Sequence, residues 1–428
     1  MSRAHEPAPD RHAGGRHAVH LRRLNLERVL ADVMQRREPF TRAEIVRATG
    51  LSVPTVGSLT TELITRGIIR DAGTGPSSGG RRPSFMEFNS RHGFVAGIDI
   101  GPTRTRLAVA DLRDEVLARR IVPTVSRGNP AETLGLLAAE ARDLMREAQV
   151  QPSRLLAVGA AAPGIVDPER GAVILAPNIE GWNDVPMREI LERELGAPVL
   201  ADNDVNLAVL GEHWRGAARG HDTCVFIFVG TGVGAGVLLG GALHRGHHYM
   251  AGEVAEMSMG PQFIGQDFGS RGCFETLAGL EALAGRWSRA HDRDPASWVG
   301  ELLRAAEDGD AEARRAVHET ACFIGMAAAN VSTVVDPSMI VLGGAMFAQA
   351  EPLLREVRNI VRRILPRAPV KIVLSELGKD APLTGTLLVA AREARRLVRV
   401  RLTERPDRRA RRTRPAATAA PSRSAGSR

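Results

Sequence analysis

Hydrophobic and polar positions repeat with the period of a helix in the first part of the chain. One apolar face is formed by Leu26, Val29, Leu30 and Val33. Residues 41–44 read T-x-x-E, a capping box that begins a second helix, and Gly50 is placed to end it. Ser52 is the expected N-cap of a third helix, which stops at Gly67. Short helices joined by a glycine turn are typical of a helix-turn-helix.

Two short apolar runs follow, and they are expected to pair as strands at residues 68–70 and 85–88. The glycine-rich, basic segment 73–83 between them has the composition of a wing. This order predicts a winged helix-turn-helix whose third helix enters the major groove of DNA. The expected DNA contacts are Pro54, Thr55, Ser58, Thr61, Arg81 and Arg82. The alternative for this region is a small helical domain that contacts protein.

From residue 91 the pattern changes to apolar strands alternating with amphipathic helices. A strand–turn–strand unit occupies residues 94–111, and a second one occupies residues 225–239. Each has a turn of small residues, and each is followed by a long helix, at 131–149 and 311–335. This repetition predicts an α/β fold that is duplicated into two lobes with a cleft between them.

Composition narrows the class of protein. Hydrophobic residues make up 43% and charged residues 25% of 428 positions, as in globular proteins. No apolar run is long enough for a membrane helix, and no signal peptide begins the chain, so we expect a cytoplasmic protein without a membrane partner. Three widely spaced cysteines fit a reducing compartment.

Charge is distributed unevenly. Residues 1–90 carry 14 Arg against nine acidic residues, and residues 401–428 carry nine Arg against two, within a net charge of +8. The centre of the chain is therefore acidic, which disfavours a nucleic-acid surface there and leaves the basic N-terminal region as the candidate.

The two turns of small residues are candidate phosphate sites, because glycine lets backbone N–H groups approach an anion. Asp99 ends the first strand and can orient a nucleotide's metal ion. The run 202–206 (DNDVN) begins an expected helix. Asp204 there is a candidate general base for a substrate hydroxyl, and the plain alternative is N-capping by Asp202 or Asn203.

Seven segments together resemble the ROK family (repressor, open reading frame, kinase), which includes the xylose and N-acetylglucosamine repressors. They are IDIGPTRTRLAVADL (98–112), AAPGIVD (161–167), PNIEGW (177–182), DNDVNLAVLGE (202–212), GTGVGAGVLLGG (230–241), AGEVAE (251–256) and GSRGCFET (269–276). The resemblance covers about residues 21–400, and the winged helix ending in GRRP is what the family's regulators carry and its free-standing kinases lack.

The resemblance implies an actin-like, hexokinase-like (ribonuclease H-like) two-lobed domain that binds a sugar in its cleft. Asp204 matches the catalytic base of the family's kinases. The implied ligand-binding residues are Gly164, Asn178, Asn203, Asp204, Glu253, Glu256 and Glu275.

One departure from the family concerns nucleotide. The kinases' first phosphate loop reads D-x-G-G-T-K, and here Pro102 and Arg104 stand in the second glycine and the lysine positions. Proline has no N–H to donate, so ATP and magnesium binding is weakened on this side. The positions that would bind nucleotide are Asp99, Gly101, Thr103, Thr231, Gly232 and Gly234.

A second departure concerns the structural zinc that the family implies. Its histidine position is Glu256 here, two of its cysteine positions are Gln266 and Phe268, and only Cys273 is kept. One thiolate cannot form a tetrahedral zinc site, so we expect no metal and no cofactor. Two explanations for Glu256 stay open: without zinc this position no longer requires a particular residue, or the carboxylate selects a different ligand.

The leading hypothesis is a homodimeric or larger DNA-binding regulator, a repressor of carbohydrate uptake or catabolism genes, controlled by a sugar and without catalytic residues. One alternative is an ATP-dependent sugar kinase with a DNA-binding appendage, using Asp204. Another is a regulator whose pocket is vestigial and which responds to a partner protein. The expected organisation is a disordered tail (1–20), the winged helix-turn-helix (21–90), the kinase-like domain (91–400, with lobe one about 91–200 plus 381–400 and lobe two about 201–380) and a disordered Arg-rich tail (401–428).

Overall fold

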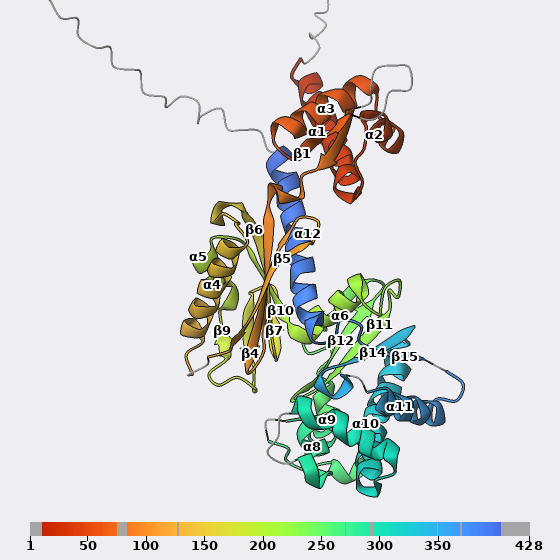
Figure 1. The fold of residues 1–428 in the computed structure, drawn as a ribbon. Coiled ribbons are helices and arrows are strands. Elements are labelled where there is room, and N and C mark those ends of the chain that lie inside the picture. Colours follow the sequence, from red (N-terminus) through yellow and green to blue (C-terminus); the bar gives the residue numbers. More distant parts are fainter. Residues whose placement is uncertain are drawn as a thin grey trace, which may run out of the picture. The chain divides into compact units, whose positions relative to one another are not determined.

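The computed structural model of the protein describes residues 11–74, 84–125, 128–269, 271–290, 295–348, 350–368 and 370–403. The chain forms two compact units (Figure 1). The smaller unit takes residues up to Phe88 and from Arg396 onward, and the larger unit takes Asn89–Arg395. The expected boundaries were 90 and 400, and the second of them falls inside a helix that runs from Ala381 to Thr403, three residues into the stretch expected to be a tail.

The smaller unit contains three helices followed by a two-stranded antiparallel sheet. Its elements are α1 (Arg11–Gln35), α2 (Arg42–Thr49), α3 (Val53–Thr65), β1 (Ile69–Thr74) and β2 (Ser84–Phe88). The start of α1 corrects the expectation of a tail over residues 1–20. The helix continues toward the N-terminus through Gly14 and Gly15, which disfavour a helix but do not end it as a proline would, and no proline follows Pro9 in this stretch.

The helix ends in the smaller unit follow the expected capping chemistry. The Thr41 hydroxyl accepts from the Glu44 N–H, and the Glu44 carboxylate accepts from the Thr41 N–H at 2.6 Å. Gly50 closes α2 with a φ of 68°, a left-handed conformation that favours glycine. Ser52 caps α3 through the Thr55 N–H. The capping predictions are thus confirmed.

The larger unit is built on two five-stranded sheets with the same topology. The first has the order β10-β6-β3-β4-β5, and the second, listed in the corresponding direction, has the order β15-β14-β11-β12-β13. In both sheets the first two neighbouring pairs are parallel and the last two are antiparallel. This repetition confirms the duplication expected from the two strand–turn–strand units. The first sheet comprises β3 (Phe94–Ile100), β4 (Arg104–Asp111), β5 (Val116–Pro123), β6 (Leu155–Ala162) and β10 (Val199–Asn203). The second comprises β11 (Cys224–Val229), β12 (Val233–Leu239), β13 (Ala242–His244), β14 (Met339–Gly343) and β15 (Lys371–Leu374).

A three-stranded sheet and nine helices among the described residues complete the larger unit. The small sheet has the order β7 (Ile165–Asp167), β8 (Ala172–Leu175), β9 (Asn183–Val185). The helices are α4 (Pro130–Glu147), α5 (Met187–Leu195), α6 (Asp204–Arg215), α7 (Cys273–Ala278), α8 (Leu280–Gly285), α9 (Pro295–Asp308), α10 (Ala311–Val335), α11 (Glu351–Ile364) and α12 (Ala381–Thr403).

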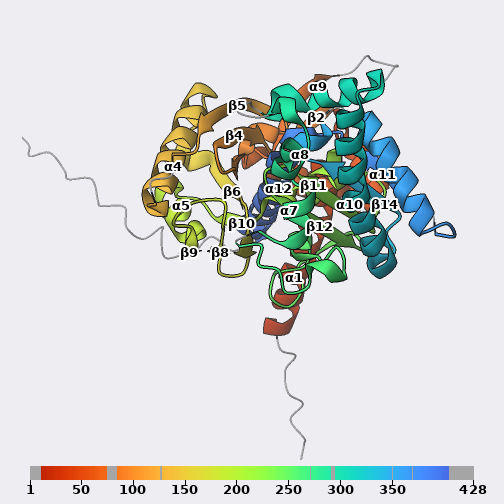
Figure 2. The ribbon, with the colours of Figure 1, turned by 90° about the horizontal axis from the view of Figure 1, so that it is seen from below.

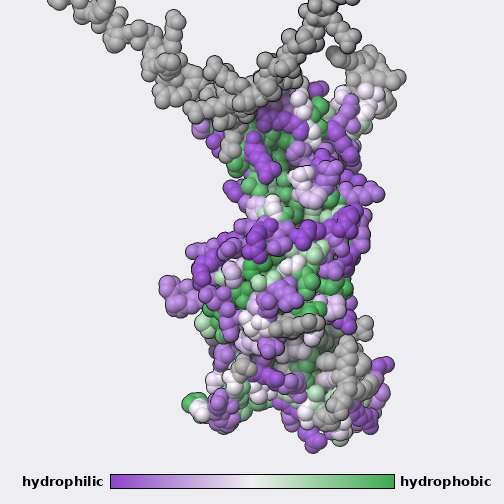
Figure 3. Space-filling view, turned by 90° about the vertical axis from the view of Figure 1, so that its left-hand side faces the viewer, coloured by the Kyte–Doolittle hydropathy of each residue, from purple (hydrophilic) through white to green (hydrophobic). Residues whose placement is uncertain are grey.

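The two sheets and their helices form layers. Helices α4 and α5 cover the outer face of the first sheet, while α9, α10 and α11 cover the outer face of the second (Figure 2). Helices α6 and α12 lie between the sheets, where their apolar side chains join those of β11 and β14 in a third core. On the surface, hydrophilic side chains are spread over the side that carries α4 and α5 (Figure 3). None of the described helices is both long and apolar enough to cross a membrane.

Glycines allow α12 to contact both lobes closely. A side chain at Gly159 on β6 would meet the Thr386 carbonyl oxygen at 2.1 Å, and one at Gly97 on β3 would meet the Thr386 hydroxyl at 2.4 Å. On the α6 side, a side chain at Gly385 would meet the Leu207 carbonyl at 1.9 Å. The last helix is therefore fixed by backbone approach against both lobes of the larger unit.

Candidate functional site

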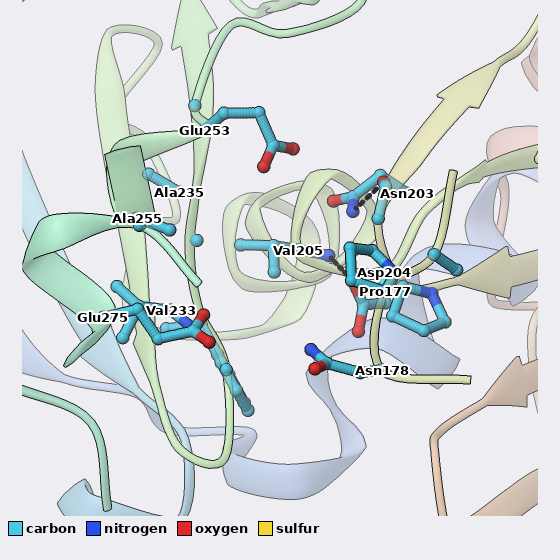
Figure 4. A pocket seen from close by; sticks show the side chains of 18 of the residues that line it. Pro177, Asn178, Asn203, Asp204, Val205, Val233, Ala235, Glu253, Ala255 and Glu275 are labelled. Carbon is cyan, nitrogen blue, oxygen red and sulfur yellow. Dashed lines mark hydrogen bonds between the residues drawn. The ribbon is translucent and has the colours of Figure 1, made fainter. Parts of the chain in front are cut away.

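A cavity in the larger unit collects residues from both lobes. It encloses about 910 Å³ including its open mouth. Every residue that the sequence indicated as ligand-binding lines it, namely Gly164, Asn178, Asn203, Asp204, Glu253, Glu256 and Glu275. Figure 4 shows Glu253 and Glu275 entering from one side, with Asn178, Asn203 and Asp204 opposite.

One set of polar groups lies where the chain leaves the first sheet, at the passage from β10 into α6. Asn203 is the N-cap of α6 and accepts from the Asn206 N–H at 2.9 Å, as one of the two capping alternatives expected, so the helix begins at Asp204. The Asn203 amide donates to the Gly164 carbonyl at 2.8 Å, and the Val205 N–H donates to Asp204 Oδ1 at 2.9 Å. Capping therefore fixes Asn203 and places the Asp204 carboxylate at the cavity wall.

Asp204 is held in an unfavourable environment for a charge. Burial raises its pKa from 3.8 to about 7, and the nearby carboxylates of Asp99 and Glu253 add to the rise. Burial also raises the pKa of Asp99, to about 6, although Arg106 opposes this. A carboxyl group with a pKa near neutrality can hold or accept a proton at physiological pH.

The second lobe supplies three carboxylates from two short elements. Glu253 and Glu256 lie at the 3₁₀ helix η3 (Val254–Glu256), and Glu275 lies on α7. Glu275 accepts from the Val233 N–H at 2.9 Å, which ties it to the second strand–turn–strand unit. Burial raises the pKa of Glu253 and of Glu275, and Glu256 raises each further by repulsion.

The two strand turns meet the cavity differently. Thr231, Gly232 and Gly234 line it, whereas Asp99, Gly101 and Thr103 do not. In the first turn the Gly101 N–H donates to the Arg104 carbonyl at 3.1 Å, and Pro102 faces the cavity without a donor.

The residues of the first turn do not fit a magnesium nucleotide. Arg106 lies directly opposite Asp99 in the β3–β4 pairing, and its guanidinium is 3.5 Å from the Asp99 carboxylate. The Asp99 carboxylate is therefore already paired with a cation from its own sheet. The second turn keeps its glycines, so only half of the expected phosphate cradle is present.

The residues present also do not fit the structural zinc of the family. Within the described ranges, no group of three or more His, Cys, Asp or Glu side chains could hold a metal ion. Phe268 instead lies 6.3 Å from Phe263, ring centre to ring centre, and both pack against the apolar core of the second lobe beside the buried Cys273. Apolar packing thus takes the place of coordination in this segment.

Several residues that line the cavity were not predicted from the sequence, and their side chains are apolar. Pro163, Pro177 and Phe228 line the cavity but belong to no polar motif. Alternation along residues 224–229 offered a weak signal, since it places Phe226 and Phe228 on one side of β11.

The expected DNA contacts lie on or after α3 in the smaller unit. Pro54, Ser58 and Thr61 are exposed, and Thr55 is partly covered by its contact with Ser52. Arg22 lies beside this face, 2.6 Å from Glu62 and 3.5 Å from the Ser58 hydroxyl. Arg81 and Arg82, and the remainder of the wing, lie outside the described residues.

Comparison with known proteins identifies the family. The model of the ROK family matches residues 95–393. The chain belongs to the ROK family. The xylose repressor of Caldicellulosiruptor bescii is 28% identical over 391 residues, covering 87% of this chain and 96% of that protein.

Solved structures of ROK proteins agree. The ROK hexokinase of Thermus thermophilus is 34% identical, with a TM-score of 0.60 over 71% of this chain and 99% of the hexokinase. A ROK family transcriptional regulator described as a homologue of the E. coli MLC protein has the same fold, with a TM-score of 0.70 at 23% identity, over 89% of this chain and 99% of that one.

Proposed function

We propose that this ROK protein is a sugar-responsive, DNA-binding transcriptional repressor of carbohydrate uptake or catabolism genes. The observation that carries the proposal is the extent of the similarity. The match to a xylose repressor covers more of the chain than the family domain does and must therefore include part of the smaller unit. The hexokinase, by contrast, is matched over 99% of its own length by only 71% of this chain.

The chemistry of the cavity supports a sugar as the effector. Carboxylates and amides suit hydroxyl groups, which both donate and accept hydrogen bonds. Asn178, Asn203 and Asp204 present two amides and a carboxylate from one side of the cavity, and Glu253 and Glu275 present carboxylates from the opposite side (Figure 4). A ligand that bridges the lobes favours one arrangement of them over another.

The smaller unit supplies the proposed DNA reader. In this proposal α2 and α3 form a helix-turn-helix, α3 enters the major groove with Pro54, Ser58 and Thr61 forward, and the wing places Arg81 and Arg82 on the backbone or in the minor groove. Sugar and operator are then linked, because each binds one conformation of the cytoplasmic homodimer better than the other.

A sugar kinase is the second candidate, and one observation favours it. Asp204 has a pKa of about 7 and lies in a cavity with a glycine-rich turn, as a general base for a sugar hydroxyl would. Pro102 and the pairing of Arg106 with Asp99 oppose nucleotide binding.

One set of measurements separates the candidates. Fluorescence anisotropy on a labelled duplex from upstream of the protein's own gene measures DNA binding, a thermal-shift panel of sugars measures ligand binding, and ADP release measures turnover. A repressor binds the duplex, is stabilised by a sugar that alters this binding, and shows no turnover. Turnover that Asp204→Asn abolishes makes the protein a kinase, and DNA binding without any sugar response favours the vestigial pocket.

Cavity variants test whether the response comes from this site. Glu253→Gln or Glu275→Gln should lower the affinity for the sugar roughly tenfold to a hundredfold, because hydrogen bonds to charged groups are strong. DNA binding without sugar should be unchanged. Glu140→Gln is the matched control. Glu140 lies on the outer helix α4, where its carboxylate pairs with Arg120. If the cavity variants respond like this control, the effector binds elsewhere.

A further inference from the structure

The charge of the cavity is one-sided. Four carboxylates line it, from Asp204, Glu253, Glu256 and Glu275, and no Lys, Arg or His is among its described lining residues. Arg271 lies near Glu275, but its guanidinium is engaged in two hydrogen bonds with Glu281. Any ligand that excludes water from this cavity must therefore compensate several negative charges.

The cavity is also rich in acceptors and poor in donors. Within the described part of the chain, nothing donates a hydrogen bond to the carboxylates of Glu253 or Glu256. Glu275 accepts from the Val233 N–H, and Asp204 accepts from the Val205 N–H of its own helix. Of the two cavity amides, that of Asn203 already donates to Gly164. A carboxylate has about four acceptor sites and no donor when ionised, so most of these sites await donors from the ligand.

A metal ion does not satisfy this arrangement. No three of the acidic side chains in the described ranges approach closely enough to bind one ion. The carboxylates nevertheless repel one another, since Glu256 and Glu275 both act on Glu253. A cation that matches this side of the cavity therefore carries hydrogen-bond donors that point in several directions, and need not contact all three carboxylates at once.

We propose that the effector of this cavity is an amino sugar with a free, protonated amine, whose ammonium group lies among Glu253, Glu256 and Glu275. The inference rests on the proposed function, because it names the class of sugar that the same site senses. An ammonium brings three N–H donors and a positive charge to the acidic side of the cavity. The sugar hydroxyls then face the opposite side, where Asn178, Asn203 and Asp204 offer both donors and acceptors.

The test compares sugars that differ at one group. Isothermal titration of the full-length protein uses glucosamine, galactosamine and mannosamine, each against its hydroxyl parent and its N-acetyl form, at a pH below the pKa of the amine. We expect at least one amine to bind roughly tenfold or more tightly than its neutral relatives. The preference should shrink as salt is added, because part of the site is open to solvent.

Glu256→Gln identifies the source of the preference. Glu256 is exposed at the cavity wall, and the amide keeps its shape while removing the charge. The ratio of amine to hydroxyl affinity should fall roughly threefold to fivefold in this variant. It should stay unchanged in Glu140→Gln, which lies on α4 outside the cavity.

The outcomes separate this inference from the function beneath it. If the hydroxyl parents or N-acetyl forms bind as tightly as the amines, the effector is a neutral sugar and only this inference fails. An amine preference that Glu256→Gln leaves intact also overturns it, because the acidic side of the cavity is then not its cause. If no sugar of either class binds, both the inference and the proposed sugar response fail.

Discussion

Replacing Asp204 with Asn should make the larger unit more stable at neutral and alkaline pH. The amide keeps the shape of the side chain and can still accept from the Val205 N–H. It removes a charge that burial and the carboxylates of Asp99 and Glu253 disfavour.

The sign and size follow from the pKa. In the native protein the pKa of Asp204 is about 7 against an ordinary 3.8, so the native state binds more protons than the unfolded state between these values. The free energy of unfolding of the wild type therefore falls as pH rises through this window. The shift corresponds to at most about 4 kcal/mol. Solvent at the open mouth screens part of it, so we expect the variant to gain about 1–3 kcal/mol at pH 8 and nothing at pH 4.

Tryptophan fluorescence during urea unfolding is the appropriate measurement. All four tryptophans, at positions 182, 214, 287 and 298, belong to the larger unit, so the signal reports that unit alone. Asp202→Asn is the matched control. Asp202 accepts from the Arg245 guanidinium at 2.6 and 3.0 Å, and removing its charge leaves that cation unpaired. The free energy of unfolding of this control should fall by about 2 kcal/mol at pH 8. The change is thus opposite in sign to that of Asp204→Asn, although the two positions are only two residues apart.

The reasoning is refuted if Asp204→Asn is destabilised at pH 8, or if its gain is the same at pH 4 and pH 8. Either result would mean that Asp204 is not a disfavoured charge in the free protein. A gain at pH 8 in the Asp202→Asn control would show that charge removal anywhere in this acidic region is stabilising.

Four further predictions address the rest of the molecule. Replacing both Arg81 and Arg82 with Ala should weaken DNA binding and reduce the salt dependence by up to about two phosphate contacts, as measured by anisotropy over a salt series. Elemental analysis of the purified protein should find less than stoichiometric zinc, and one zinc per chain would contradict the reading of the replaced ligand positions. Sedimentation should show at least a dimer at micromolar concentration, since one winged helix reads too few base pairs, and a monomer that binds its operator tightly would oppose this. Gly159→Ala should prevent normal folding of the larger unit, seen as altered near-ultraviolet circular dichroism, because the new methyl group would lie 2.1 Å from the Thr386 carbonyl.

Local chemistry in the sequence was sufficient for the ends of a few elements. The capping box at Thr41, the cap at Ser52 and the helix at Ala311–Val335 depend on neighbouring residues, and the structure has them where the pattern placed them. Each of the seven residues predicted to bind ligand also lies in a short sequence motif, so this polar part of the cavity could be assembled from motifs.

Contacts between distant segments could not be predicted in the same way. The pairing of Asp99 with Arg106 depends on the register of β3 and β4, and a shift by one residue would have separated the two side chains. Phe228 enters the cavity only because of how the second sheet packs, which no polar motif announces. The extent of α1 depended on the absence of a stop signal, which is weaker information than a cap.

The position of α12 has a consequence for synthesis. It covers the inner face of the first sheet, at Gly97 and Gly159, yet among the described helices it is the last to leave the ribosome. Roughly 180 residues separate the end of β10 from the start of α12, which corresponds to about 10–35 s of translation at 5–20 residues per second. The nascent first lobe spends this interval with one face of its sheet uncovered. A premature stop anywhere before residue 381 therefore affects the earliest-made sheet, and such products should be substrates for chaperones and proteases.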